Sequence, residues 1–361
     1  MTSLPLPSLF CFGFEGTTPP DRLRPLLEAG LGGVILFRRN LHNLEQICRL
    51  TAGLHAAASA PLLLGVDQEG GRVTRLPPPF LSPPSAATLG LADDPALTKA
   101  LARAVGRELC ATGFTWNLAP VLDVRTNLAN PVIGDRAFSQ DPDQVARHGV
   151  AAIQGLTESG VLATAKHFPG HGDTVADSHL TLPESLQSSS RWRAVEFVPF
   201  RRAIQAGVPL VLVAHLSCPA LDPASPTSLS HPVITGILRE ELGFDGVVVS
   251  DDLEMSAIAD RFDLGEAAVR FLEAGGDLAL ICHNTERQRA AVEAVEKAVQ
   301  SGRLSEARLA ASLERIALLR EWVGTRRTPV DVQTARAIVG SGDHQQLLQA
   351  FPKAVGHSPL L

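Results

Sequence analysis

Eight short apolar runs, most of them separated by longer amphipathic stretches, constrain the fold of this 361-residue chain most strongly. Within these runs apolar and polar residues do not alternate, which is typical of strands that are buried on both faces, as in a parallel sheet. The runs, rich in Val, Ile, Leu and Phe, cover residues 8–14, 32–37, 61–67, 114–123, 161–168, 208–215, 246–252 and 277–283.

Helix-like stretches lie between most of these runs, and several end at a glycine directly before the next run, which is a helix stop signal. They cover residues 21–30, 44–58, 96–113, 143–160 and 194–207. Eight strands that alternate with helices predict an α/β fold, a single (β/α)8 TIM-type barrel. Its long loops, 68–95 and 169–192, follow the third and fifth strands. A doubly wound open sheet is the alternative, but no GxGxxG follows the first strand, which disfavours a dinucleotide-binding domain.

We expect the barrel to fill residues 1–323, with two C-terminal helices at 286–302 and 305–323. Residues 324–361 form a weakly patterned tail whose structure we do not predict. A hydrophobic content of 45% with 19% charged residues excludes general disorder.

Composition and charge also limit the binding partners and the cellular compartment that we expect for this protein. The net charge of −6 offers no basic surface for nucleic acid or anionic lipid, and no apolar run is long enough for a membrane helix. The N-terminus lacks the positive head of a secretory signal, and the five cysteines are scattered without CxxC spacing. We therefore expect a cytoplasmic monomer with reduced thiols that binds neither nucleic acid nor membrane.

Ionisable residues stand at the ends of six of the predicted strands. Such residues are costly at the rim of a buried strand unless they are solvated or paired. Since parallel strands of a barrel end on the same face, the pattern predicts one polar pocket there; the alternative is a set of rim charges that pair with helix N-termini. The residues are Asp67, Asp123, Lys166, His167, His215, Asp251, Asp252 and His283.

The densest cluster is KHFPGHGDTVADSH at 166–179. Three interpretations compete: a metal site, a loop held by its own hydrogen bonds, and acid/base catalysis. Pro169 and the glycines beside it forbid the helix that would place the histidines on one face for a metal. Asp177 and His179 are two residues apart and would project to the same side of an extended segment. A carboxylate there could support a protonated imidazole that protonates a leaving group and later activates water.

The segment GFDGVVVSDDLEM at 243–255 ends a strand in two carboxylates. Adjacent residues of a strand face opposite sides, so we expect Asp251 to face the pocket and Asp252 to point away and pair, or to cap a helix. An inward carboxylate that faces an acid/base group across a sugar ring is the arrangement of glycoside hydrolysis.

Two further segments, DQEGGRVTRL at 67–76 and GDRAF at 134–138, combine carboxylates with guanidinium groups. Such groups suit sugar hydroxyls, each of which is both donor and acceptor, and an amide carbonyl. Taken singly, Arg72, Arg75 and Arg136 could equally be loop staples.

Together these segments resemble glycoside hydrolase family 3 of the β-N-acetylhexosaminidase type. KHFPGHGDTVADSH matches the family signature, SDDLEM resembles its nucleophile motif, and DQEGGRVTRL and IGDRAFS resemble its sugar-binding segments. The resemblance covers roughly residues 8–320, and the order of all four segments agrees.

The resemblance implies a retaining enzyme that needs no metal or cofactor. Asp251 would be the nucleophile, and His179 the acid/base with Asp177 as its partner. The residues that would bind N-acetylglucosamine are Asp67, Arg75, Arg136, Lys166 and His167. The implied substrate is terminal β-linked N-acetylglucosamine on anhydro-muropeptides or related cell-wall fragments. A phosphorylase of the same glycosides, and a sugar-binding barrel without catalysis, are the alternatives.

Overall fold

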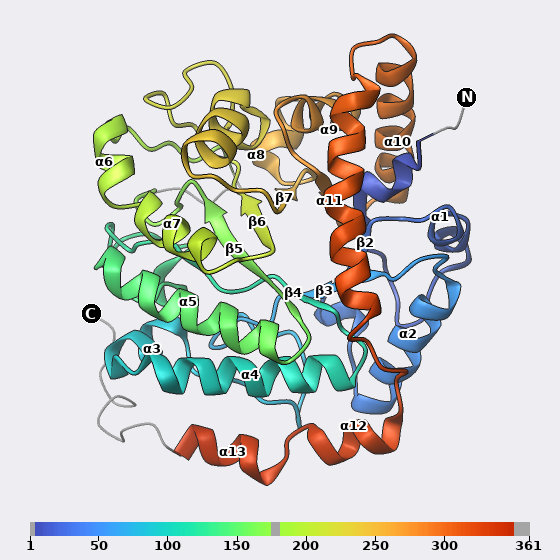
Figure 1. The fold of residues 1–361 in the computed structure, drawn as a ribbon, viewed down its shortest axis with the longest axis vertical. Coiled ribbons are helices and arrows are strands. Elements are labelled where there is room, and N and C mark those ends of the chain that lie inside the picture. The colour runs from blue at the N-terminus through green and yellow to red at the C-terminus, as the bar shows by residue number, and fades with distance from the viewer. Residues whose placement is uncertain (1–3, 175–180, 350–361) are drawn as a thin grey trace.

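Eight parallel strands close into a barrel in chain order, each hydrogen-bonded to the next and β8 to β1 (Figure 1). This computed structural model describes residues 4–174 and 181–349. The strands are β1 (Phe10–Phe12), β2 (Gly33–Leu36), β3 (Leu63–Val66), β4 (Trp116–Asn117), β5 (Leu162–Phe168), β6 (Leu210–Val213), β7 (Val247–Asp252) and β8 (Leu278–Ile281). Each lies within one of the eight apolar runs, so the predicted (β/α)8 barrel is confirmed.

The predicted helices form around the barrel, and most begin where the sequence supplies a capping side chain. The side chains of Asn43, Asp94, Asp141, Asn284 and Ser305 accept a backbone N–H in the first turn of their helices. These helices are α2 (Leu44–Ala57), α4 (Pro95–Ala111), α5 (Pro142–Glu158), α10 (Thr285–Gln300) and α11 (Glu306–Gly324). The two other predicted stretches contain α1 (Arg24–Glu28) and α7 (Phe197–Gln205).

Several shorter elements lie outside the stretches that the helix pattern predicts. They are α3 (Ala86–Ala92), α6 (Ser189–Ala194), α8 (Ser256–Ala259), α9 (Leu264–Glu273) and the π-helix η6 (Pro232–Glu241). Single 3-10 turns are η1 (Leu6–Leu9), η2 (Asp21–Leu23), η3 (Arg38–Asn40), η4 (Gly134–Arg136) and η5 (Thr227–Leu229).

The C-terminal segment adds two helices that the weak sequence pattern did not predict, α12 (Val332–Ile338) and α13 (Gly342–Gln349). They lie along α4, and α12 also contacts α2 (Figure 1). The buried Glu108 of α4 fastens this segment: its Oε1 accepts the N–H of Gly340 at 2.9 Å and lies 2.8 Å from Nδ1 of His344. Its Oε2 accepts the N–H of Leu81 at 2.7 Å, which ties the same side chain to the loop after β3.

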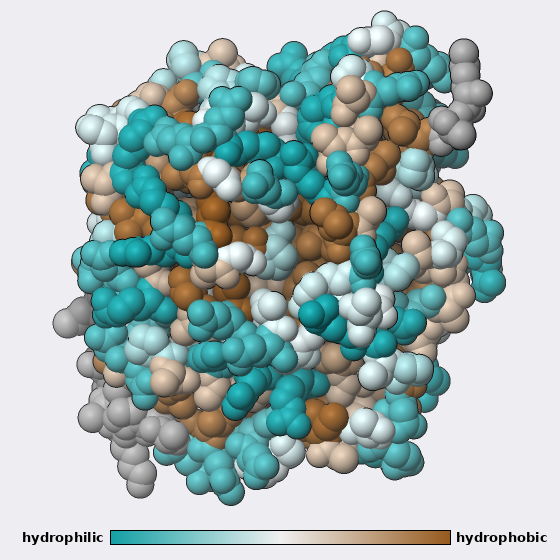
Figure 2. Space-filling model, viewed as in Figure 1, coloured by the Kyte–Doolittle hydropathy of each residue, from teal (hydrophilic) through white to brown (hydrophobic). Residues whose placement is uncertain are grey.

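The strands are buried almost throughout, and their side chains belong to one hydrophobic core that extends to the helices. On the face drawn in Figure 2, hydrophilic residues dominate the periphery and hydrophobic ones appear mainly near the centre. No described helix is long and apolar enough to cross a membrane. The cysteines are all free, and four of the five are buried.

Candidate active site

A pocket of about 470 Å³ opens at the carboxyl ends of the barrel strands. This is the face at which barrel enzymes place their chemistry. Most of the strand-end residues that the sequence singles out line it: Asp67, Lys166, His167, Asp251, Asp252 and His283. Arg75 and Arg136, the other two predicted sugar-binding residues, line the same pocket. The structure therefore brings the five predicted sugar-binding side chains together with Asp251.

Lys166 forms the centre of a buried charge network on one side of the pocket. Its Nζ lies 2.8 Å from Oδ1 of Asp67 and 2.7 Å from Oε1 of Glu69. Arg136 donates to both oxygens of Glu69, each at 2.8 Å, in the bidentate geometry that guanidinium and carboxylate favour. Burial alone would raise the pKa of Glu69, but the charges of Arg136 and Lys166 hold it well below its usual range.

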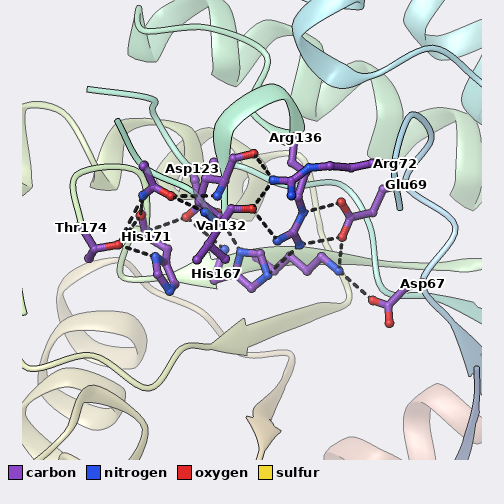
Figure 3. Close-up of polar contacts among 12 residues, drawn as sticks. Asp67, Glu69, Arg72, Asp123, Val132, Arg136, His167, His171 and Thr174 are labelled. Atoms are coloured by element: carbon purple, nitrogen blue, oxygen red, sulfur yellow. Dashed lines mark hydrogen bonds and ion pairs between the residues drawn. The ribbon is translucent and has the colours of Figure 1, made fainter. Parts of the chain in front are cut away.

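His167 extends this network to Asp123, which follows β4 (Figure 3). Its Nδ1 lies 2.7 Å from Oδ2 of Asp123, and its Nε2 lies 3.2 Å from a guanidinium nitrogen of Arg136. Because a guanidinium only donates, Nε2 must accept there, and the imidazole proton must be on Nδ1, which donates to Asp123. Asp123 therefore fixes the tautomer and the orientation of the His167 ring.

Adjacent strand residues normally face opposite sides, yet Lys166 and His167 both line the pocket. The pairing of β5 with β6 shifts register between Ala165 and Phe168, which lets both side chains turn inward.

His171 also lines the pocket and is buried. Its backbone N–H donates to Oδ1 of Asp123 at 2.6 Å, and its Nδ1 lies 2.7 Å from the hydroxyl of Thr174. Burial lowers the pKa of His171 to about 4, against the opposing charge of Asp123, so the ring is neutral at pH 7.

The predicted acid/base pair, Asp177 and His179, lies outside the described residues. Before these residues, Oδ2 of Asp173 accepts from the Ser185 hydroxyl at 3.2 Å and from the Gln187 amide at 3.1 Å. Asp173 thus fastens the chain before residue 175 to the chain after residue 180.

The expectation that Asp252 points away from the pocket is wrong, because Asp251 and Asp252 both line it. The pairing of β7 with β8 shifts register between Val249 and Asp252, so strict alternation fails at this strand end. Nor does Asp252 cap a helix, since the N-cap of α8 is Met255.

Asp252 does pair, as expected, but mainly with backbone groups. Its Oδ1 accepts the N–H of Glu254 at 3.1 Å and that of Cys282 at 3.2 Å. Its Oδ2 lies 3.5 Å from Nε2 of His283. Burial raises the pKa of Asp252 to about 7. The backbone N–H groups and His283 stabilise its ionised form less than the two cations Arg136 and Lys166 stabilise that of Glu69.

The arginines divide between the two roles that the sequence left open. Arg72 is a loop staple, since its Nε donates to Asp135 at 2.8 Å and its guanidinium also donates to the carbonyl of Val132. Arg75 lies 3.9 Å from Asp67, and its Nε is buried without a hydrogen-bond partner among the described residues. A buried donor of this kind suits a ligand oxygen.

Sequence reasoning gave no binding role to Glu69, Asp123 or His171. Glu69 stands two residues after Asp67, and this spacing was the one available signal for its position at the pocket. In the described part of the chain, 4–174 and 181–349, no three His, Cys, Asp or Glu side chains are grouped so that they could hold a metal ion.

Comparison with known proteins decides the family. The model of the glycosyl hydrolase family 3 N terminal domain matches residues 20–319. The chain belongs to glycoside hydrolase family 3. The predicted enzyme class, glycoside hydrolase, is thereby confirmed.

Relatives within this family carry hexosaminidase names. A beta-hexosaminidase from Alkalilimnicola ehrlichii is 41% identical over 281 residues, which cover 76% of this chain and 80% of the relative. Beta-hexosaminidase A from Pseudoalteromonas piscicida is 34% identical over 94% of this chain, and the match spans 61% of the relative's length. A solved family 3 beta-N-acetylglucosaminidase from Paenibacillus sp. superposes with a TM-score of 0.87 at 42% identity, covering 94% of this chain and 68% of that one.

Proposed function

We propose that this protein is a retaining β-N-acetylhexosaminidase that removes terminal β-linked N-acetylglucosamine through a covalent glycosyl-enzyme intermediate on Asp251. One observation carries the proposal: the carboxylate strand end of β7 and the charge network of β3 to β5 line a single pocket of about 470 Å³. In the closed barrel β7 lies across from β3, so a sugar ring between them could meet both.

Each group on the network side has chemistry that suits a sugar. Lys166 and Arg136 donate hydrogen bonds, whereas Asp67 and Glu69 accept them, and a hydroxyl needs partners of both kinds. Arg75 adds its buried donor. Because these groups already hold one another, they would bind the sugar with little reorganisation, which favours precise placement of the anomeric carbon.

The proposed reaction has two steps. In the first, the Asp251 carboxylate attacks the anomeric carbon as the glycosidic bond breaks, and His179 gives its proton to the departing oxygen. In the second, His179 takes a proton from water, which attacks the anomeric carbon and releases Asp251. Asp177 would stabilise the protonated imidazole. His171, although it lines the pocket, is neutral and buried, and its ring is hydrogen-bonded to Thr174, so we assign the acid/base role to His179.

Three properties of this proposal go beyond the hydrolysis itself. We place the natural substrates among anhydro-muropeptides or related cell-wall fragments, the site of action in the cytoplasm, and the working form as a monomer. The hexosaminidase names of the relatives support the amino-sugar part of this assignment.

The sugar specificity is tested with aryl β-glycosides that differ only in the substituent at C2. We expect kcat/KM for the acetamido sugar to exceed that for the hydroxyl sugar by at least about hundredfold, because a site built for an amide loses its hydrogen bonds with the other sugar. Equal rates for the two would contradict the proposal. Turnover that depends on added phosphate would identify a phosphorylase instead, and a pocket that binds the sugar without turnover would identify a binding protein.

A further inference from the structure

Two aromatic rings stack at the rim of the pocket, after β2 and β8. The ring centroids of Phe37 and His283 are 5.7 Å apart, with 25° between the ring planes. Both residues line the same pocket as Asp251. The His283 side chain is 52% exposed, so a face or an edge of this stack is open to a ligand.

The stack is held from behind by Arg39. Its guanidinium carbon lies 4.5 Å over the Phe37 ring, and one of its nitrogens donates to the carbonyl of Cys282 at 2.7 Å. The backbone N–H of His283 donates to the carboxylate of Glu254. The rings therefore form a prepared surface rather than two loose side chains.

The position of the Phe37–His283 stack relative to the charge network decides which part of a bound substrate could reach it. In the closed barrel β8 is the neighbour of β7, which carries Asp251. It lies across the barrel from β4, the middle strand of the three that carry the charge network. If the hydroxyls of the terminal sugar face the network and its anomeric carbon faces Asp251, the group attached to that carbon leaves on the side away from the network. Of the strands outside the network, β6, next to β5, contributes only Leu212 to the pocket lining, whereas the ends of β8 and of β2, next to β3, contribute the two rings.

This wall carries no excess positive charge, which disfavours an anionic ligand. Glu15 lies 2.9 Å from Arg39, Glu254 lies 3.9 Å from Arg287, and Asp252 lies 3.5 Å from His283. Burial and then the charge of Arg39 lower the pKa of His283, so its ring is neutral at pH 7. A neutral aromatic surface favours the carbon–hydrogen face of a sugar ring over a phosphate or carboxylate.

We propose that the Phe37–His283 stack is the binding subsite for the first ring of the leaving group, and that this ring is an uncharged pyranose. The proposal rests on the proposed function and adds the substrate class on the leaving-group side. It predicts that the enzyme recognises a disaccharide unit, whatever is attached beyond it.

The test compares two substrates that share the terminal sugar. N,N′-diacetylchitobiose has a pyranose as its leaving group, whereas the 2-acetamido β-glycosyl fluoride has no leaving-group ring. We expect His283→Ala to lower kcat/KM on the disaccharide by roughly fivefold to tenfold, the range of an aromatic contact, and to leave the fluoride within about twofold. His283→Phe, which restores an aromatic ring but not a titrating group, should bring the disaccharide rate back to within about threefold of the native enzyme.

His42→Ala is the matched control, because His42 is exposed and does not line the pocket. Equal losses on both substrates with His283→Ala would overturn the subsite and assign His283 to the support of Asp252. Failure of His283→Phe to restore the disaccharide rate, or no loss with His283→Ala, would also overturn it. If the native enzyme cleaves neither substrate, the proposed function itself fails, and that result is distinct from failure of the subsite alone.

Discussion

The two walls of the pocket bury acids in opposite ways. The charged wall is formed by Asp67, Glu69, Arg136, Lys166 and His167, with Asp123 buried behind His167, and neighbouring groups lie 2.7 to 3.2 Å apart. On the aromatic wall, formed by Phe37, Asp251, Asp252 and His283, Asp252 has the neutral imidazole of His283 at 3.5 Å. Burial penalises both Glu69 and Asp252, yet the pKa of Glu69 is lowered and that of Asp252 is raised to about 7.

This difference shows that the partners of a buried acid, more than its burial, decide its charge. Two cations keep Glu69 ionised, whereas backbone N–H groups and one neutral imidazole do not suffice for Asp252 at neutral pH. The charged wall is thus suited to hold a sugar. The aromatic wall places Asp252, a carboxyl group that can gain or lose its proton near neutral pH, beside the proposed nucleophile Asp251. The first three predictions below each act on one wall and leave the other intact.

The largest effect should come from the nucleophile position. Asp251→Asn should lower kcat by roughly ten-thousandfold or more, because the covalent intermediate cannot form, while the thermal unfolding midpoint stays close to that of the native protein. Its neighbour supplies the matched control, since Asp252→Asn should retain far more activity. A larger loss in Asp252→Asn than in Asp251→Asn would reverse the assignment of the two carboxylates.

The next effect concerns the stability of the charged wall. Lys166→Met should lower the free energy of unfolding by roughly 3 kcal/mol, because Asp67 and Glu69 would lose the buried cation that they share. Denaturant unfolding measures this loss. The control is Lys99→Met, which removes a partner of Glu158 in an exposed pair and should cost under about 1 kcal/mol. Equal losses in the two variants would mean that the buried network contributes no more than a surface pair.

On the aromatic wall, Asp252 should make the protein less stable as the pH rises, whereas an acid paired with cations makes it more stable. The folded-state pKa of Asp252, about 7, lies above its ordinary value of 3.8, so its contribution is fully present below pH 3.8 and is lost as pH rises through 7. Asp252→Asn removes this loss and keeps an oxygen for the N–H groups of Glu254 and Cys282. Its stability relative to the native protein should therefore rise by roughly 2–3 kcal/mol between pH 5 and pH 8.

Urea unfolding at both pH values measures this change, with the exposed Asp260→Asn as control. A stability difference that does not change between pH 5 and pH 8 would show that Asp252 is ionised throughout this range.

The smallest effect concerns metals. A strong chelator should leave the hydrolysis rate within about twofold, because the proposed steps use only carboxylates and imidazole. Loss of activity that zinc restores would revive the interpretation of residues 166–179 as a metal site.

The barrel and the edge that carries the site could be predicted from the sequence. The eight apolar runs do not alternate, which identifies buried parallel strands, and a polar residue at a strand end must lie at the rim. Asp67 and Lys166 are 99 residues apart, yet they meet because β3 and β5 end on the same face of the barrel. The sequence could not reveal which rim residues bond to one another, so the roles of Glu69 and Asp123 were missed.

Local departures from regular strand geometry could not be predicted either. The register shift before Asp252 turns it into the pocket, and nothing in SDDLEM signals that shift. Likewise, α12 and α13 have little hydrophobic pattern of their own, and the buried Glu108 that fastens them lies more than 200 residues earlier in the chain. Such features depend on tertiary contacts, which local sequence patterns do not reveal.

The central claim is that Asp251 forms a covalent bond to the sugar. A fluorinated N-acetylglucosaminyl fluoride that slows release of the intermediate, followed by proteolysis and mass spectrometry, tests it most directly. We predict one sugar adduct per chain, on Asp251, that disappears in Asp251→Asn and persists in Asp252→Asn. An adduct on Asp252, or efficient turnover of the native enzyme without any trapped sugar, would contradict the claim.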